Sequence, residues 1–399
     1  MGLTIAYIRQ DSRVFLDRSK SASAVGGWDE RIALLRGASL RGHRVRVYGK
    51  LSSDDALELS KIKNTEHAGD QPVSKDVDLV FFDNGSTSPR HMTMQDRGFV
   101  TASSDAVLKL RDYHGPVFYH MSDLRLYPMV LPDVHHPSCG LTLEDVFYGK
   151  RWFVLTKAQD VEAFAVSCKN DPTRSFMCDI GMHARYFNMS CVIDEMLGGV
   201  EPTLKNHIVY VGHHRGRFDK IVKWYGHLDI NRTTQSIVYG KWPDDLCDEL
   251  RKNRIAHRGV LSNTDLRRVA GSSLFSIYIT DKEYDDLRIK TTRFYEWIAG
   301  GGTLLFPRDQ MRAFDGLVDD KFVLDDVSDV CDWIVDIAGM SFDERKAVRD
   351  EQFSWIENET PEKRMIELEQ LHEEILSMSE SEFTELSRAR EIDYESVAR

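Results

Sequence analysis

Short apolar runs alternate with segments of helical character along most of this chain, and this alternation restricts the fold more than any other feature. Between the first two runs, residues 29–41 have helical periodicity and end before Gly42, a residue suited to closing a helix. Strands separated by helices are typical of βαβ units, in which the strands pair in parallel. In the first half of the chain the runs lie at residues 3–8, 44–48, 78–82, 116–120 and 152–155.

A second series of strand and helix signals follows an irregular segment at residues 188–205. Its first strand signal is followed by a helical pattern at 219–225. We therefore predict an α/β protein built from two Rossmann-like, doubly wound domains that face a cleft. In such sheets ligands bind beyond the carboxyl ends of the strands. The apolar runs of this series lie at residues 208–211, 236–239, 273–279 and 303–306.

Acidic residues gather in the last part of the chain. The net charge is -12, and residues 341–399 contribute -9 of it, with seventeen Asp or Glu against eight Lys or Arg. We divide the chain into a domain at 1–195, a domain at 206–345 and an acidic helical tail at 346–399. Pro361 is expected to start a helix that packs back on the body through one apolar stripe, and an interaction arm is the alternative. The stripe consists of Met365, Leu368, Leu371 and Ile375.

Composition excludes several classes of protein. No apolar run approaches the ~20 residues of a membrane span, and the chain starts with strand-like residues instead of a basic and apolar leader, so a soluble cytoplasmic protein is expected. The six cysteines show no CxxC spacing, which argues against a disulfide framework or a zinc site. His135-His136 with Cys139, and His213-His214, also lack convincing zinc spacing.

Residues 281–306 carry the clearest signal of a ligand site. Arg293 and Glu296 lie three residues apart, so they share one helix face and would place a cation for phosphate beside a carboxylate for ribose hydroxyls. The glycine triplet 300–302 would end the helix and let the backbone pass closely before the next strand. The alternative is a surface helix with an ion pair and a glycine cap.

A second signal follows the strand at 208–211. Arg215 and Arg217 lie in a glycine-containing turn before a helix, where guanidinium groups and helix-start N–H groups can bind one diphosphate. A basic surface loop is the alternative. The chain has neither a GxGxxG nor a GxxxxGK[ST] motif, which argues against a dinucleotide oxidoreductase and a P-loop enzyme. A loosely bound Mg²⁺ or Mn²⁺ on the diphosphate is compatible with this site.

Two carboxylates in the first half are candidates for catalysis. Asp123 follows a strand between apolar neighbours and could take the proton of an attacking hydroxyl, although it could also be an N-cap or an ion-pair partner of Arg125. Glu30 opens the first helix and could hydrogen-bond a ligand across the cleft. It could equally be a first-turn acid that the helix dipole favours.

At these residues the chain resembles the DNA β-glucosyltransferases of T-even phages, which are two-domain GT-B enzymes. The segment 210–220, YVGHHRGRFDK, is similar to the glycine and arginine loop that binds the diphosphate in that family. The turn 259–261 looks like the one whose backbone reads uracil, and 281–286 with 292–296 look like the closing motif. The resemblance implies that the second domain binds the UDP portion. The residues it assigns to UDP are Gly212, Arg215, Arg217, Leu261, Tyr284, Arg293 and Glu296, with Glu296 on ribose.

The resemblance extends to the first half, which it makes the acceptor-binding domain. Asp123 falls in a segment similar to the one with the family's catalytic base, and Glu30 falls where the family has a glutamate in its sugar cleft. The loop after the third apolar run looks like the family's DNA-probing loop. Residues implied to contact DNA are Asn84, Gly85, Ser86 and Arg125.

Together these features predict an inverting transferase that moves glucose from a UDP-sugar to a hydroxymethylated pyrimidine in double-stranded phage DNA. Such an enzyme would act as a monomer in the host cytoplasm. Since the tail repels DNA, phosphate contacts would come from Arg90, Lys109 and Arg111. A GT-B enzyme acting on a glycan, lipid or small molecule is the alternative, which the acidic charge favours. A non-catalytic nucleotide-sugar or DNA-binding module and an epimerase of the same fold are also open.

Overall fold

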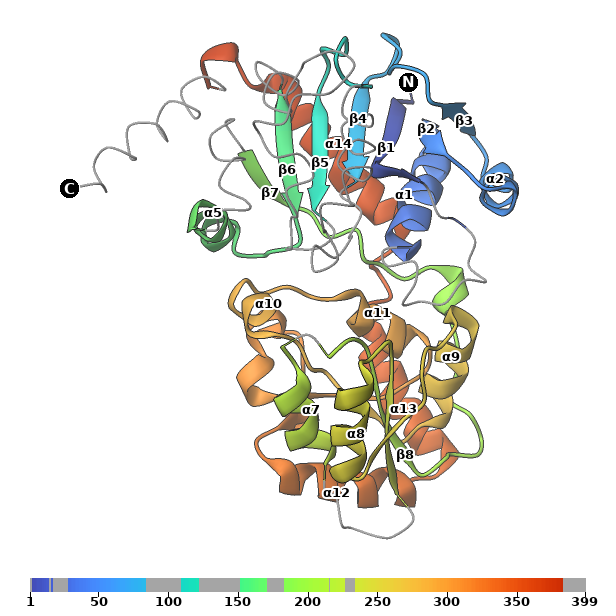
Figure 1. Cartoon of the computed structure of the whole chain (residues 1–399), viewed down its shortest axis with the longest axis vertical. Helices are drawn as coiled ribbons and strands as arrows, with labels where there is room; N and C mark the ends of the chain where they lie inside the picture. Colours follow the sequence, from blue (N-terminus) through green and yellow to red (C-terminus); the bar gives the residue numbers. More distant parts are fainter. Residues whose placement is uncertain are drawn as a thin grey trace, which may run out of the picture. The chain divides into compact units, whose positions relative to one another are not determined.

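The computed structural model describes residues 2–13, 16, 28–83, 109–121, 151–170, 183–214, 216–226 and 234–382 (Figure 1). Their contacts divide them into two compact units. The first unit contains β1, residues 30–189 and the chain from 361 onward, and the second contains residues 190–360. These divisions differ from the domain limits at 1–195, 206–345 and 346–399, which remain predictions.

The first unit is built on a parallel sheet of seven strands in the order β3-β2-β1-β4-β5-β6-β7. The order runs outward from β1 in both directions, as in a doubly wound sheet. The strands are β1 (Thr4–Arg13), β2 (Arg44–Lys50), β3 (Thr65–Gly69), β4 (Leu79–Asp83), β5 (Val117–Met121), β6 (Trp152–Thr156) and β7 (His183–Tyr186). Described helices of this part of the chain are α1 (Trp28–Leu40), α2 (Ser53–Ser60), α5 (Val161–Asn170) and α14 (Pro361–Ser377).

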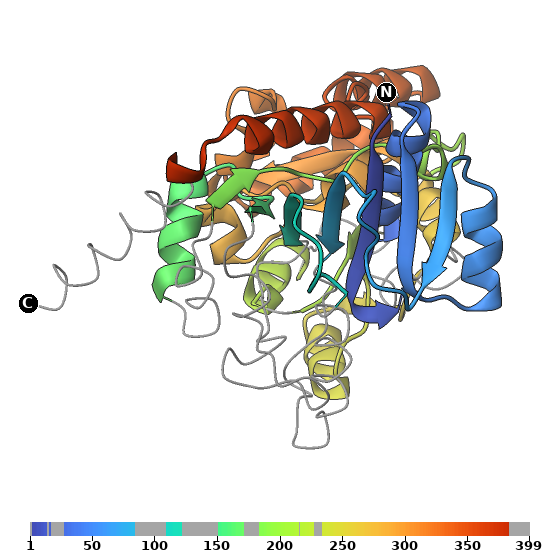
Figure 2. The same cartoon turned by 90° about the horizontal axis from the view of Figure 1, so that it is seen from above.

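Helix α14 belongs to the first unit although it comes last in the chain. It runs along that unit's sheet (Figures 1 and 2), and Met365, Leu368 and Ile375 are buried there. Its acidic side chains bind basic residues of the unit: Glu369 lies 2.6 Å from Nε2 of His43, and Glu374 lies 2.6 Å from Arg185. Further contacts reach residues that precede strands, namely Asp78 and Arg151. Helix α14 therefore contacts the amino ends of β2, β4 and β6.

The second unit repeats the doubly wound plan with shorter strands. One sheet has the order β10-β9-β8 and another the order β11-β12-β13, and a parallel bridge from Ile208 to Phe275 joins β8 to the chain before β11. The strands are β8 (His207–Val211), β9 (Gln235–Tyr239), β10 (Ile255–His257), β11 (Ser276–Ile277), β12 (Leu304–Pro307) and β13 (Val323–Leu324). The helices are α7 (Phe218–Tyr225), α8 (Asp244–Lys252), α9 (Asn263–Ser272), α10 (Lys282–Asp286), α11 (Thr292–Ala299), α12 (Val327–Gly339) and α13 (Phe342–Ser354).

The prediction of an α/β protein with two doubly wound parallel sheets is confirmed. One expected strand, at 273–279, is wrong in extent, since only Ser276–Ile277 forms β11. Ser273 is the C-cap residue of helix α9. The N–H of Thr280 donates to the side chain of Gln310 and not to a neighbouring strand. In the described part of the chain, no helix is long and apolar enough to cross a membrane.

Polar side chains are buried on one face of the first sheet, near its carboxyl edge. Oδ2 of Asp83 accepts a hydrogen bond from the Tyr7 hydroxyl at 2.7 Å, and Oδ1 lies 3.2 Å from Nδ1 of His120. Burial opposes the charge of Asp83, but His120, Arg9 and Arg31 outweigh that effect and hold its pKa well below the ordinary value. A charged carboxylate therefore links β1, β4 and β5 inside the protein.

Asp83→Asn is expected to destabilise the first unit by about 3 kcal/mol at pH 7, because it breaks a buried charge cluster. The depressed pKa makes this stabilisation complete above about pH 4, the pKa range of an unfolded Asp, and it is lost as the pH falls through the folded value. Melting curves from pH 7 to pH 3 should show a constant difference between the wild type and the variant down to about pH 4 and a narrowing difference below it. The matched control, Asp76→Asn, removes an exposed carboxylate and should shift melting far less; equal shifts would contradict the role of Asp83.

Candidate functional site

Three neighbouring strands of the second unit each lead into a glycine at their carboxyl ends. Gly212 follows β8, Gly240 follows β9, and Gly259 lies just beyond β10. The N–H of Gly212 donates to Tyr239 at 2.9 Å, and the N–H of Gly240 donates to the carbonyl of Gly259 at 2.6 Å. A Cβ on Gly240 would lie 2.1 Å from the carbonyl oxygen of Gly212. At Gly240 only glycine lets the two chain segments approach so closely, and backbone hydrogen bonds join the three strand ends.

Arg217 lies where the chain enters helix α7 after β8. It occupies the N-cap position, and its side chain makes no capping hydrogen bond to the helix. Its side chain is only 17% exposed, with Nη2 3.4 Å from Oδ2 of Asp281. Its Nε is buried and has no hydrogen-bond partner among the described residues. A guanidinium with a spare buried donor beside a helix start is suited to binding an anion.

Helix α10 supplies the second side of the Arg217 environment. Asp281 caps this helix by accepting a bond from the N–H of Tyr284 at 3.1 Å, and the Tyr284 ring lies 5.9 Å from the Arg217 guanidinium carbon. Burial opposes the charge of Arg217, but Tyr210, Asp281 and Tyr284 raise its pKa overall. The guanidinium therefore keeps its charge in a largely dry position. The structure thus brings together two of the predicted residues, Arg217 and Tyr284.

Helix α11 carries the Arg and Glu pair predicted from the sequence. The buried Tyr278 hydroxyl accepts a bond from the N–H of Thr291 at 3.2 Å and so fixes the start of the helix. Nη1 of Arg293 lies 2.8 Å from Oε2 of Glu296, and these side chains are 29% and 13% exposed. Arg293 and Glu296 therefore form an ion pair within one helix, as the alternative of a surface helix with an ion pair predicted. Its partial exposure leaves both groups open to a ligand.

The glycine triplet ends α11 as predicted, and its close contacts are with the protein itself: with backbone at Gly301, and with the Trp297 ring at Gly302. Gly301 has a φ of +89°, and a Cβ there would lie 2.5 Å from the carbonyl carbon of Gly199. A Cβ on Gly198 would in turn meet the carbonyl oxygen of Gly300 at 2.5 Å. The triplet thus allows two backbone segments to pack together, which explains it without a ligand.

The base turn and the first-unit carboxylate are also placed by the structure. Leu261 follows Gly259 and is half-buried. Glu30 is buried on α1 and forms an ion pair with Lys157, which follows β6 directly. The other predicted site residues lie outside the described residues, and their roles stay predictions: Asp123, Arg215, Asn84, Gly85, Ser86 and Arg125.

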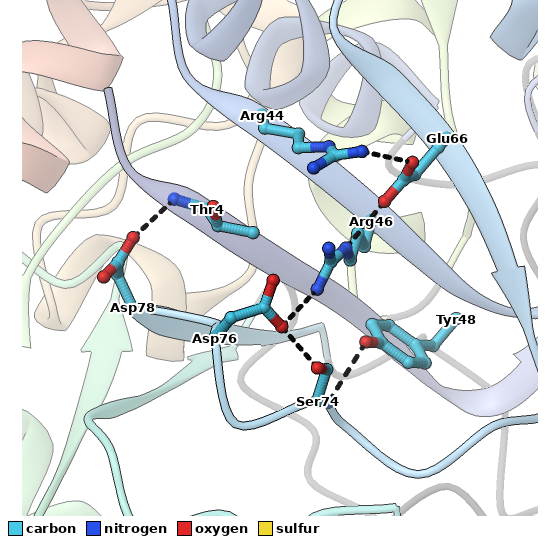
Figure 3. Close-up of polar contacts among 8 residues, drawn as sticks. All are labelled: Thr4, Arg44, Arg46, Tyr48, Glu66, Ser74, Asp76 and Asp78. Atoms are coloured by element: carbon cyan, nitrogen blue, oxygen red, sulfur yellow. Dashed lines mark hydrogen bonds and ion pairs between the residues drawn. The ribbon is translucent and has the colours of Figure 1, made fainter. Parts of the chain in front are cut away.

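Basic side chains of the first unit are largely neutralised by acidic neighbours. On β2, Arg44 binds Glu66 at 2.9 Å, while Arg46 binds both Glu66 at 2.6 Å and Asp76 at 2.7 Å (Figure 3). Lys109 is only 8% exposed and lies 2.9 Å from Asp70. The expectation that Lys109 contacts DNA phosphates is therefore wrong, because its ammonium group is buried and paired. Arg111 remains more than half exposed, and Arg90 lies outside the described residues.

No described group of three His, Cys, Asp or Glu side chains could hold a metal ion. The ring of His214 packs against Trp242 at 5.7 Å instead. Trp242 and Gly240 are site residues that sequence reasoning missed. A signal for Gly240 was present, since it follows the strand at 236–239 as Gly212 follows β8. No local signal indicates the contact of Trp242 with a residue 30 positions away.

No protein-family model and no curated protein matches the sequence. Solved structures do match. A structure of T4 phage β-glucosyltransferase is 16% identical with a TM-score of 0.64, and the match covers 94% of this chain and 100% of that one. Another, of the T4 phage enzyme with UDP and Mn²⁺, has a TM-score of 0.66 at 16% identity and the same coverage, 94% and 100%. A glycosyltransferase from Rickettsia africae is 13% identical with a TM-score of 0.53, covering 95% and 100%.

The chain therefore has the GT-B fold, and the predicted structural resemblance to the T-even phage enzyme is confirmed. The matches extend over nearly the whole chain, so both units take part in the resemblance. At these identities the likeness concerns the fold.

Gly240→Ala is expected to cost about 2 kcal/mol, because Gly240 has a φ of +148° and the new Cβ would collide with the backbone of Gly212. Thermal melting should show the loss. Gly339→Ala is the matched control, since a Cβ at the end of α12 meets nothing within 4 Å. If both variants melt alike, the strand ends are not in the tight contact described.

Proposed function

We propose that this protein is an inverting glycosyltransferase that moves a sugar, glucose, from a UDP-sugar to the hydroxyl of a hydroxymethylated pyrimidine in DNA. The observation that carries the proposal is Arg217, a shielded guanidinium with a spare donor, at the start of α7 beside the glycine-rich strand ends. The GT-B fold supports the reaction class. The T4 phage neighbour, a β-glucosyltransferase described as a DNA-modifying enzyme, supports the acceptor.

The second unit would bind the nucleotide through both charge and backbone. Arg217, Arg215 and Arg293 would bind the diphosphate, and the Gly212 turn would let it approach the backbone. The turn at Gly259 and Leu261 would contact uracil through main-chain groups. Glu296 would leave its ion pair with Arg293 and accept hydrogen bonds from ribose, while Arg293 turned to phosphate.

The chemical step would be a direct displacement at the anomeric carbon. Asp123 would take the proton of the acceptor hydroxyl, and that oxygen would form the new bond to the sugar. The bond from the sugar to the diphosphate would break with its electron pair leaving on UDP. The arginines would stabilise the charge that develops there. Glu30 would accept a hydrogen bond from the sugar, and its ion pair with Lys157 would then be partly lost. In DNA the target base would have to leave the stack.

A second acceptor class is favoured by one observation. Arg44, Arg46 and Lys109 of the first unit are paired with carboxylates, so these residues offer DNA little free positive charge. A glycan, lipid or small-molecule acceptor would suit such a surface better. The same donor site would serve either acceptor.

A divalent cation would find few protein ligands among the described residues. Since they contain no set of three metal-ligating side chains, Mg²⁺ or Mn²⁺ would be held mainly by the diphosphate itself. No step above depends on it.

Arg217→Gln is expected to weaken UDP binding by roughly thirtyfold, equivalent to about 2 kcal/mol for a charged hydrogen bond. Calorimetric titration with UDP measures this, and melting without ligand checks the fold. Arg251→Gln, on the exposed face of α8, is the matched control and should bind UDP like the wild type. A wild type with no affinity for UDP would remove the donor proposal.

Transfer itself is tested by mass spectrometry of hydroxymethylated duplex DNA incubated with UDP-glucose. A hexose adduct is expected with the wild type, and Asp123→Asn should abolish it while UDP affinity stays unchanged. An adduct formed at the wild-type rate by Asp123→Asn would exclude Asp123 as the base. UDP release from UDP-glucose without any DNA adduct would point to the second acceptor class, and UDP binding without turnover on any acceptor would indicate a non-catalytic module.

A further inference from the structure

Trp242 lies behind the strand ends and contacts the loop proposed to bind diphosphate. Its indole Nε1 donates a hydrogen bond to the carbonyl of Gly212 at 2.9 Å. Its ring packs against His214 of the same loop at 5.7 Å and Phe218, the first residue of α7, at 6.4 Å. The side chain is buried, so it shapes the loop from inside and does not offer a face to a nucleobase.

His257 has the corresponding place behind the base turn. Its Nε2 lies 2.9 Å from the carbonyl of Gly240, and since a carbonyl only accepts, Nε2 carries the proton. Nδ1 is then an acceptor in the neutral ring, and the thiol of Cys247 lies 3.4 Å from it. Burial raises the pKa of Cys247, so this thiol keeps its proton and can donate it. Gly240, held in this way, donates its own N–H to Gly259 at 2.6 Å.

We infer that Trp242 and His257 are positioning residues that set the two halves of the nucleotide site separately: Trp242 the diphosphate loop, and His257 the base turn. This inference rests on the proposed UDP site. Neither side chain would touch the ligand; each fixes the peptide that does.

The separation follows from where each hydrogen bond ends. The Trp242 bond fixes the carbonyl at the beginning of the loop that leads to Arg217, so its loss changes where the guanidinium points. The His257 bond fixes the carbonyl of Gly240, and the N–H of the same residue donates to the carbonyl of Gly259. The two rings pack 6.4 Å apart, so replacing either by another ring preserves most of the packing.

The test compares UDP with uridine, which lacks the diphosphate, on Trp242→Phe and His257→Phe. Each variant removes the hydrogen-bond donor to a glycine carbonyl and keeps a ring, and His257→Phe also removes the Nδ1 acceptor beside the Cys247 thiol. Trp242→Phe should weaken UDP about fivefold, the effect of roughly 1 kcal/mol, and leave uridine unchanged. His257→Phe should weaken both ligands by the same factor, because both contain uracil. Calorimetry serves for UDP and ligand-observed NMR for uridine, and melting without ligand checks each fold.

A ratio of UDP to uridine affinity that falls in Trp242→Phe and stays constant in His257→Phe supports the inference. If wild-type protein binds UDP but the ratio moves equally in both variants, or in neither, the inference is wrong while the proposed donor site stands. If wild-type protein does not bind UDP, the proposed function itself fails. Should Trp242→Phe not fold, Trp242→Tyr, which keeps a larger ring, takes its place with the same expected outcomes.

Discussion

The charge of a guanidinium that is largely removed from water needs nearby acceptors or negative charge. In the second unit this requirement applies to Arg217. Within the described residues its compensation comes from Tyr210 and from Asp281 at 3.4 Å, while Nε has no partner there. A buried charge with unsatisfied donors costs free energy that an arriving anion can recover. The same residue stands at the first turn of α7, where the helix start also favours negative charge. Both effects select the same ligand chemistry.

Backbone groups of three glycines lie near the strand ends that lead to this candidate site. Gly212, Gly240 and Gly259 bring main chain to the edge of the sheet where parallel strands end, and their hydrogen bonds to one another fix the directions of the peptides. Recognition by main chain needs little from side chains at the surface. Its accuracy depends instead on buried groups such as Trp242 and His257, which hold the peptides in place. The nucleotide site proposed for the second unit can therefore be understood from a few strand ends.

Much of this fold could be predicted from sequence because its longer strands are continuous apolar runs. All residues of β4, β5 and β6 are buried, and their mostly apolar sequences indicate this burial. The strand β3 was missed since its sequence, TEHAG, is mostly polar and half exposed, and β13 has only two residues, too few for any periodicity. Arg217, Arg293 and Glu296 could be proposed from sequence because charge and spacing mark them locally, and their ligand roles stay predictions. Trp242 could not be found, since its role depends on a contact that only the folded chain creates.

The place of α14 has a consequence for how the protein is made. The helix is the last described one in the chain, yet it packs on the first unit, with Gly37 of α1 so close to Pro361 that a Cβ would lie 2.3 Å from its carbonyl oxygen. Domains commonly fold as units while synthesis proceeds from the N-terminus. The first unit, however, includes residues 361–377, which are synthesised after residues 190–360 of the second unit. The domain whose synthesis begins first is thus the last to be completed, and the sheet face that α14 covers stays open to water or chaperones until then.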